Sequence, residues 1–304
     1  MTKAFLPLTL AAFCAAGAAL ADETIHIGFP PSIDTLPGLV AHENGCLKRA
    51  GYDSVLVPTP VVTNIPPALL SGSLQIGIST PTVILPAVEN GIDMVAIAGS
   101  SVMQKGNEGL SLVTRTGLGI TTAKDLEGRK VGVPGLLSVA DLVFRKWLVT
   151  EGVDPATITF VEVPFPRMAE MMKAGSIDAV VAAEPVLGAL VSGGLAERNA
   201  GEYYSAVADD ALITLWATTG EWARSNPEAV KAFTACLDES IDWIRANRDA
   251  AGEIAKTHLN VNPPYTPAWR TAIVPADFDF FVGVGREFDL LTGDVDTKTL
   301  VAGD

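Results

Sequence analysis

Short apolar runs alternate with helix-like stretches from Thr24 to Val191, and this alternation restricts the fold more than any other feature of the sequence. Strands that alternate with helices form α/β folds with a largely parallel sheet. The expected strands are 24–29, 53–57, 74–79, 94–98, 110–114, 130–133, 158–163, 177–182 and 212–218. The expected helices are 36–50, 65–70, 83–90, 139–151, 167–174, 185–191, 227–248 and 249–258. The tail from Pro263 is mixed and gives no clear pattern.

An internal repeat is the second constraint. The segment 27–31 (IGFPP) resembles 131–135 (VGVPG), and 70–76 (LSGSLQI) resembles 173–179 (KAGSIDA). Both matches occur in the same order and at nearly the same spacing. A single match would be explained by the general similarity of strand–turn–helix units, but two at one spacing indicate two similar α/β lobes.

The first 21 residues read as an export signal. A basic start at Lys3 is followed by an apolar run from Ala4 to Ala21, which ends in the small-residue site Ala19-Leu20-Ala21. This pattern is typical of a cleaved secretory signal peptide, so Asp22 would be the first mature residue and the protein would be exported. The alternative is a membrane anchor, since the run is near the lower length limit for crossing a bilayer.

Composition excludes several classes of function. Asp and Glu number 35 against 21 Lys and Arg, a formal charge of −14, which disfavours nucleic acid as a partner. Three cysteines and three histidines are too few and too scattered for a zinc cluster, so we expect no metal and no cofactor. An oxidising compartment would allow Cys46 and Cys236 to pair, but nothing in the sequence brings them together, and we expect two separate buried thiols.

Ligands of parallel sheets bind beyond the carboxyl ends of the strands, so the loops that follow the strands are the candidate site. These loops are rich in hydroxyl groups, which with backbone N–H groups at helix starts can hold a small anion without Lys or Arg. The candidates in the first copy of the internal repeat are Ser32, Asp34, Thr35, Ser79, Thr80 and Thr82. The hydroxyl residues are equally suited to plain helix capping, and Asp34 to an exposed turn.

Three further candidates come later in the chain. Ser138 precedes an expected helix, where it is also a plausible cap. Glu184 stands before Pro185 at a strand end and could bind a ligand amine or cap a helix. Trp216 lies on the expected strand 212–218, where it could stack on a ligand, although a Trp there is more often part of the core. Ser100 and Ser101 lie at a suitable hinge position between the lobes.

Common enzyme motifs are missing. The sequence contains no phosphate-binding P-loop, no dinucleotide-binding glycine fingerprint and no G-x-S-x-G nucleophile turn. We therefore assign no catalytic residues and expect a binding protein rather than an enzyme.

Several segments together resemble the periplasmic solute-binding proteins of ABC importers, in the group that takes nitrate, sulfonates, taurine and thiamine precursors. The matching segments are 27–30 (IGFP), 68–72 (ALLSG), 96–100 (AIAGS), 124–135 (KDLEGRKVGVPG), 174–179 (AGSIDA), 184–185 (EP) and 226–233 (NPEAVKAF). From about residue 24 to 257, the order and spacing of these segments resemble the order and spacing found in the family.

The resemblance implies a two-lobed periplasmic-binding-protein fold of type II, in which two similar α/β lobes are joined by two crossings. The first lobe would comprise residues 22–102 and 214–304, and the second 103–213. The family function implies a monomeric receptor in the periplasm that clamps a small-molecule ligand between the lobes and delivers it to an ABC permease in the inner membrane. The resemblance places the ligand at the loops around 32–35, 79–82, Ser138 and Glu184.

Three functions follow as hypotheses. The first is an importer receptor for a small oxyanion such as a sulfonate, taurine or nitrate. The second is the same role for a thiamine-precursor pyrimidine or another nitrogen heterocycle, with Glu184 pairing ring nitrogens and Trp216 stacking. The third is an enzyme on the same fold, similar to pyrimidine synthases, which the export signal disfavours.

Overall fold

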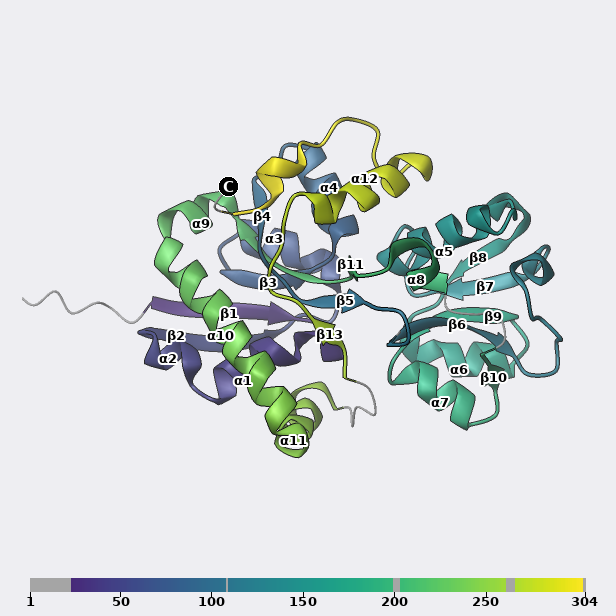
Figure 1. The fold of residues 1–304 in the computed structure, drawn as a ribbon, viewed down its shortest axis with the longest axis horizontal. Helices are drawn as coiled ribbons and strands as arrows, with labels where there is room; N and C mark the ends of the chain where they lie inside the picture. Colours follow the sequence, from purple (N-terminus) through teal and green to yellow (C-terminus); the bar gives the residue numbers. More distant parts are fainter. Residues whose placement is uncertain (1–22, 108, 199–202, 261–265, 303–304) are drawn as a thin grey trace, which may run out of the picture.

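A computed structural model describes residues 23–107, 109–198, 203–260 and 266–302. The expected signal peptide, residues 1–21, and Asp22 lie outside the described residues. Two five-stranded sheets lie at opposite ends of the long axis of the molecule, with a small sheet between them (Figure 1). Among the described helices, none is both long and apolar enough to cross a membrane.

The first sheet has the strand order β2-β1-β3-β12-β4, and all but β12 run parallel. Its strands are β1 (Glu23–Phe29), β2 (Tyr52–Pro58), β3 (Ile76–Ser79), β4 (Met94–Gly99) and β12 (Leu215–Thr219). β3 and β4 are buried along their whole length, which fits strands covered by helices on both faces.

Helices cover both faces of this sheet. They are α1 (Leu36–Glu43), α2 (Cys46–Arg49), α3 (Ile65–Leu70), α4 (Pro81–Glu89), α9 (Gly220–Ser225), α10 (Pro227–Ala246), α11 (Arg248–Leu259) and α12 (Ala276–Glu287). α1, α10 and α11 pack against one another, whereas α12 packs on α4. α10 begins with Pro227 at a position that suits proline, and it buries residues at helical spacing along one side.

The expected helix 36–50 is wrong as one continuous element. Gly45 adopts φ 65°, in the left-handed region, and separates α1 from α2. Glycine reaches this conformation without the steric cost that a Cβ would impose. The break turns the chain so that Cys46 faces α10.

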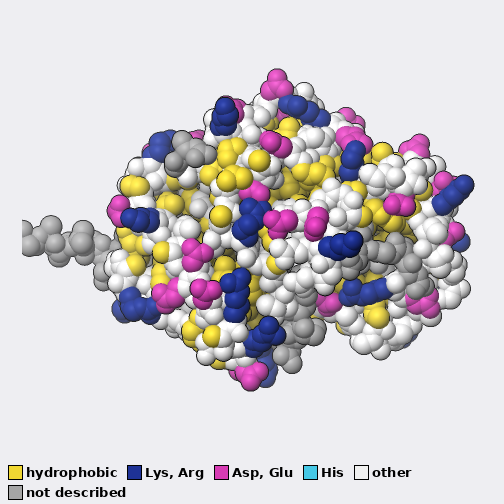
Figure 2. All heavy atoms as spheres, viewed as in Figure 1, with side chains coloured by type: hydrophobic (Ala, Val, Ile, Leu, Met, Phe, Trp, Pro, Cys, Tyr) yellow, Lys and Arg dark blue, Asp and Glu magenta, His cyan; other side chains and the backbone are white. Residues whose placement is uncertain are grey.

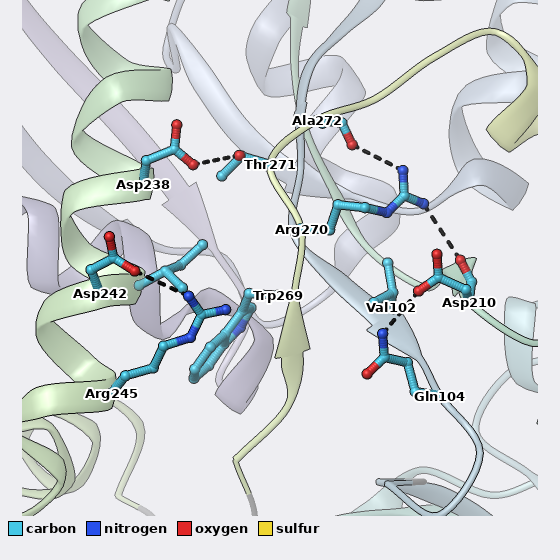
Figure 3. A pocket seen from close by; sticks show the side chains of 11 residues that line it. Val102, Gln104, Asp210, Asp238, Asp242, Arg245, Trp269, Arg270, Thr271 and Ala272 are labelled. Carbon is cyan, nitrogen blue, oxygen red and sulfur yellow. Dashed lines mark hydrogen bonds and ion pairs between the residues drawn. The ribbon is translucent and has the colours of Figure 1, made fainter.

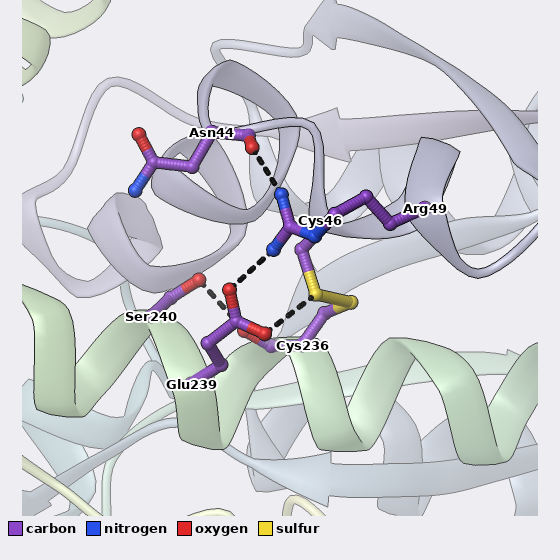
Figure 4. The surroundings of a disulfide bond; sticks show 6 residues. All are labelled: Asn44, Cys46, Arg49, Cys236, Glu239 and Ser240. Carbon is purple, nitrogen blue, oxygen red and sulfur yellow. Dashed lines mark hydrogen bonds and ion pairs between the residues drawn. A yellow bond between two sulfur atoms is a disulfide. The ribbon is translucent and has the colours of Figure 1, made fainter.

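Cys46 and Cys236 form a disulfide between α2 and α10, with 5.7 Å between their Cα atoms (Figure 4). The expectation of two separate thiols is therefore wrong. The two positions are 190 residues apart, and the break at Gly45 and the docking of α10 on α1 bring them together. Nearby, Arg49 forms an ion pair with Glu239 at 2.5 Å. A disulfide of this kind fits an oxidising compartment.

The second sheet has the order β10-β6-β9-β7-β8. Its strands are β6 (Leu110–Arg115), β7 (Lys130–Val133), β8 (Thr159–Glu162), β9 (Ala179–Ala183) and β10 (Ala196–Glu197). The helices of this region are α5 (Val139–Thr150), α6 (Phe165–Lys173), α7 (Val186–Ser192) and α8 (Tyr203–Ala208).

The two sheets confirm the internal repeat. β2, β1, β3, β12 and β4 occupy the same positions as β8, β7, β9, β6 and β10, and the fourth strand of each sheet is antiparallel to the third. The echoed residues take equivalent places, since Ile27 pairs with Ile76 in one sheet and Val131 with Ala179 in the other. The echoed glycines Gly72 and Gly175 both have positive φ. The two lobes are therefore similar α/β units.

A three-stranded sheet joins the two larger ones. It consists of β11 (Ala211–Leu212), β5 (Ser101–Met103) and β13 (Ala268–Trp269), with β5 in the middle. The expected strand 212–218 is thus two strands, because Ile213 and Thr214 pass from the small sheet to the first sheet. We call this small sheet and residues 213–214 the hinge region.

Candidate functional site

The loop after β1 holds three of the predicted site residues in one ordered turn. The Ser32 hydroxyl donates to Oδ2 of Asp34 at 2.6 Å, and the Thr35 hydroxyl donates to the carbonyl of Ser32 at 2.7 Å. Ser32 also caps the 3-10 helix Ile33–Thr35. Thr35 is fully buried, so its hydroxyl stabilises the loop through the bond to Ser32. Ser32 and Asp34 remain partly exposed.

The Asp34 carboxyl is surrounded by groups that leave it poorly solvated. Burial raises the pKa of Asp34, while hydrogen bonds from the Ser32 and Ser101 hydroxyls and from its own backbone N–H partly oppose the rise. The hydroxyl of Ser100 donates to the backbone carbonyl of Asp34 at 2.8 Å. The loop after β1 is therefore fastened to the segment where β4 passes into β5.

The same segment contacts Thr214, which sequence reasoning missed. The Ser101 and Thr214 hydroxyls lie 2.8 Å apart, and the backbone N–H of Ser101 donates to Oγ1 of Thr214 at 3.2 Å. Ser100 and Ser101 are buried. The sequence shows a serine pair at a strand end. It does not show that Thr214 is the partner of Ser101, because that contact depends on how distant segments pair in three dimensions.

The end of β3 brings a further predicted residue to this edge of the sheet. Ser79 pairs with Leu215, and Leu215 pairs in turn with Gly99. The Ser79 hydroxyl is buried and has no hydrogen-bond partner among the described residues. Such a group is costly unless water or a ligand satisfies it. Thr80 and Thr82 lie at the start of α4, with their hydroxyl oxygens 3.2 Å apart.

The predicted role of Trp216 as a ligand platform does not fit its place in the structure. Its side chain is 1% exposed and belongs to the core beneath α1 and α10. The ring meets Phe233 edge-on, with 5.2 Å between centroids. Trp216 pairs with Ile78 across the sheet, so both side chains point to the face that α1 covers. The register of β12 therefore places the Trp216 side chain in the core.

Ser138 lies beyond the carboxyl end of β7, in the second sheet. It caps α5, accepting from the backbone N–H of Asp141 at 3.4 Å. Asp141 is fully buried and accepts from the backbone N–H of Leu137 and from Arg145, both at 2.8 Å. Burial raises the pKa of Asp141, and its two partners partly oppose this. Leu137 has φ 58°, so Asp141 holds a strained turn in place.

Glu184 lies at the end of β9 and is already paired. Its Oε2 accepts from the backbone N–H of Gly188 at 3.1 Å, and its Oε1 lies 3.2 Å from Arg198. The Glu184 side chain is 11% exposed and that of Arg198 is 45% exposed. Sequence reasoning missed Arg198, which places a positive charge beside a predicted ligand residue.

The predicted residues form two groups, one for each large sheet. Ser32, Asp34 and Thr35 share one loop, and backbone pairing places Ser79 on the same sheet edge. Ser138 and Glu184 follow β7 and β9 of the second sheet. β1 points toward the second sheet and β7 toward the first (Figure 1), so the two groups occupy strand ends that face one another.

A cavity of about 530 Å³ lies elsewhere, between α10 and the hinge region (Figure 3). Asp238, Asp242 and Arg245 of α10 form one wall, and Trp269 and Arg270 stand opposite. A second cavity, of about 670 Å³, is lined by residues between Leu118 and Arg129. None of the nine predicted residues is among those that line these two cavities.

Charges of both signs are interspersed over the face drawn in Figure 2. Lys and Arg side chains lie singly among Asp and Glu there, which is unlike the basic stripe of a nucleic-acid-binding face. Among the described residues, no group of three His, Cys, Asp or Glu side chains could hold a metal ion.

The family model for NMT1/THI5-like proteins matches residues 32–251. The chain belongs to the NMT1/THI5-like family. A protein of Brucella abortus that is named as a binding protein is 26% identical over 272 residues, which cover 86% of this chain and 79% of that protein. This NMT1/THI5-like chain therefore matches a relative over most of both lengths.

Solved structures share the fold of this NMT1/THI5-like protein. The periplasmic aliphatic sulphonate binding protein SsuA from Escherichia coli superposes with a TM-score of 0.80 at 16% identity, covering 92% of this chain and 97% of SsuA. The periplasmic nitrate-binding protein NrtA from Synechocystis PCC 6803 gives 0.75 at 17% identity, covering 91% and 84%. The chain thus has the α/β fold of periplasmic binding proteins.

Proposed function

We propose that the protein is the periplasmic solute-binding component of an ABC importer. One observation carries the proposal: the predicted polar residues stand at the carboxyl ends of parallel strands in two similar sheets, and these ends face each other. That is where ligands of parallel sheets bind. The first lobe comprises residues 22–102 and 214–304, the second 103–213, and solute binding closes one on the other.

The solute we propose is a small molecule with an oxyanion head, such as a sulfonate or nitrate. The Ser79 hydroxyl, which has no hydrogen-bond partner among the described residues, offers an uncharged donor on the first sheet. Arg198 offers a cation on the second, next to Glu184. The likeness of the fold to SsuA and NrtA supports the same class of solute.

A nitrogen heterocycle, such as a thiamine-precursor pyrimidine, is the second candidate. The carboxyl groups of Asp34 and Glu184 favour it, since carboxylates pair with protonated ring nitrogens and amino groups. The burial of Trp216 weighs against it, because the expected stacking partner is occupied by the core. An enzyme on the same fold remains a third hypothesis, which predicts conversion of the bound solute.

The expected partner is a permease in the inner membrane, and the expected location is the periplasm. The signal-like N-terminus supports export. The disulfide between Cys46 and Cys236 supports an oxidising compartment.

Isothermal titration with taurine, an alkanesulfonate, nitrate and an aminopyrimidine tests the proposal. We expect one of the oxyanions to bind. Ser79→Ala should then weaken binding about tenfold, because a donor to the solute is lost. Arg198→Gln should weaken it at least as much, since hydrogen bonds from charged donors are stronger.

Two matched variants control for non-specific effects. Ser240→Ala removes a buried serine hydroxyl from α10, and Arg167→Gln removes an exposed arginine of α6 that pairs with Glu170. Neither should change the affinity. If only the aminopyrimidine binds, the proposal of an oxyanion solute is wrong and the heterocycle is the solute. If mass spectrometry detects a converted solute, the protein is an enzyme and the proposal of a receptor is wrong.

A further inference from the structure

An ion pair between two helices joins the two proposed lobes. Nζ of Lys146 on α5 lies 2.7 Å from Oε2 of Glu287, the last residue of α12. α5 belongs to the second lobe and α12 to the first. Of the ion pairs formed among the described residues, this is the only one that crosses between the lobes.

The stability of α12 alone does not explain a glutamate at this position. The carboxyl end of a helix carries a partial negative charge, so a carboxylate in the last turn is unfavourable there. Lys146 supplies the cation that compensates for it. The position of Glu287 therefore makes sense through its contact with the second lobe.

The start of α12 is fixed to the hinge region. Arg270 directly follows β13, and its two terminal nitrogens donate to the two carboxylate oxygens of Asp277 at 3.2 and 2.7 Å. Asp277 lies in the first turn of α12 and also accepts from the backbone N–H of Val274 at 2.8 Å. Two-pronged contacts between arginine and a carboxylate fix orientation as well as distance.

The body of α12 lies on the first lobe and its far end reaches the second. Phe278 and Phe281 are fully buried, and α12 packs on α4. The helix has 12 residues, so it is about 18 Å long at about 1.5 Å per residue. It extends from α4 toward α5 (Figure 1). A helix anchored at one end thus presents Glu287 to the other lobe.

We infer that the Lys146–Glu287 pair is a clasp, which holds the second lobe against the first and sets the fraction of molecules whose lobes are arranged to grip the solute. The inference rests on the proposed function, because it assumes that the lobes move and that a solute binds between them. Lys146 and Glu287 are positioning residues, since both act on the solute only through the lobes.

The anchoring of α12 makes the clasp sensitive to the angle between the lobes. A rotation about the hinge region moves α5 while α12 stays with the first lobe, so the two charges separate. A partly exposed ion pair changes the ratio of two arrangements by about two- to fivefold. The affinity for the solute falls with the fraction of molecules in the competent arrangement. The clasp can therefore tune affinity at a distance from the solute.

Salt distinguishes this clasp from the apolar packing of α12. The two side chains are 31% and 35% exposed, so dissolved ions can screen their charges. The screening length falls from about 30 Å at about 0.01 M salt to about 3 Å at about 1 M. Apolar contacts are not weakened in this way. High salt should therefore loosen the clasp and leave the rest of α12 in place.

The test measures the distance between the lobes in the exported, ligand-free protein. Lys231→Cys on α10 and Lys173→Cys on α6 provide exposed positions for spin labels, one on each lobe. The native Cys46 and Cys236 are bonded to each other and do not take up label. Pulsed electron–electron double resonance gives the distance distribution at about 0.01 M and about 1 M potassium chloride. We expect one dominant distance at low salt, and a second distance whose share grows about two- to fivefold at high salt.

Charge reversal assigns this response to the pair. Lys146→Glu places two carboxylates opposite each other, so the second distance should be prominent already at low salt. Lys146→Glu/Glu287→Lys restores the attraction in the opposite order, and both the distances and the salt response should return to those of the wild type. The affinity for the oxyanion should fall in the single variant and recover in the double variant. A purely structural role of Lys146 would not be rescued in this way.

A matched control separates the clasp from a general effect of charge. Arg224→Glu breaks an ion pair with Asp93 at 2.8 Å, and both of these residues lie in the first lobe. Its distances should follow the wild type. The clasp is overturned if Lys146→Glu leaves the distances unchanged, if the double variant does not restore them, or if Arg224→Glu changes them equally.

Failure of the clasp and failure of the proposed function can be told apart. The distances are measured without a solute, so an unchanged distribution overturns the clasp and leaves the receptor intact. If the distances respond as expected while none of the titrated solutes binds, the clasp stands as a contact that sets the lobe arrangement, and its role in affinity is wrong together with the proposed solute.

Discussion

Gly38 of α1 lies directly against the indole ring of Trp216, so closely that a Cβ atom on Gly38 would stand 2.5 Å from Cη2 of the ring. Gly38 is buried within a helix, and Trp216 is buried within a sheet. The pair sets the distance between α1 and the first sheet. Since α1 directly follows the loop after β1, it also sets where that loop lies.

Gly38→Ala should therefore destabilise the protein despite the higher helix propensity of alanine. We expect the free energy of unfolding to fall by about 1–3 kcal/mol, because overpacking forces the ring or the helix to move. Urea denaturation measures the change. Gly252→Ala is the matched control: Gly252 lies on α11 with no atom near its Cβ position, so alanine should stabilise by about 0.5–1 kcal/mol. Equal effects of the two variants would contradict this packing.

Removing the disulfide should lower the thermal stability substantially. The bond closes a loop of 190 residues in the unfolded chain, and a cross-link of that span is worth about 5 kcal/mol in the chain-entropy account. Differential scanning calorimetry of Cys46→Ala/Cys236→Ala should show a lower Tm. Dithiothreitol should lower the Tm of the wild type and leave that of the double variant unchanged. If dithiothreitol does not change the Tm of the wild type, the two cysteines are not bonded.

Asp34→Asn should raise the stability at neutral pH. Burial raises the pKa of Asp34, so the folded state binds this proton more tightly than the unfolded state does. The ionised carboxylate therefore costs stability above its folded pKa, and the cost disappears as the pH falls through that value. The Tm difference between variant and wild type should grow from pH 4 to pH 8. A difference that is constant across this range would exclude a raised pKa.

Asp141→Ala should destabilise the second lobe. The change leaves Arg145 without its partner and the backbone N–H of Leu137 without an acceptor. Breaking a buried pair costs about 3–5 kcal/mol, and we expect the low end because Arg145 is 21% exposed. Urea denaturation gives the value.

A double variant checks the origin of this cost. Arg145→Met removes the unpaired charge while preserving an apolar stem against Phe160. Asp141→Ala/Arg145→Met should therefore be more stable than Asp141→Ala alone. Strict additivity of the two single changes would show that the charges do not interact.

Local patterns predicted the strands of the two large sheets except β10, but not their order in each sheet. Apolar runs and glycine turns are read within a few residues, and the predicted helix 65–70 agrees with α3. The repeat added long-range information, because two echoed segments at one spacing imply equivalent strand positions. The echoed turns at Gly72 and Gly175 share the backbone conformation that glycine permits.

The contacts that the sequence did not predict share a physical cause: they depend on which segments meet in space. Cys46 reaches Cys236 only because α10 returns to pack on α1. Trp216 is assigned to the core by the register of β12 against β3, which no local pattern specifies. The pairing of Glu184 with Arg198 likewise depends on how the chain returns to the edge of β6.

The disulfide also closes residues 46–236 into one covalent ring, and the whole of the second sheet lies within that ring. A protease that cuts one peptide bond within this stretch would not release a fragment, since the two pieces would stay linked through sulfur. Such nicked molecules would migrate as intact protein on a gel until they were reduced, so the protein could accumulate cuts without falling apart.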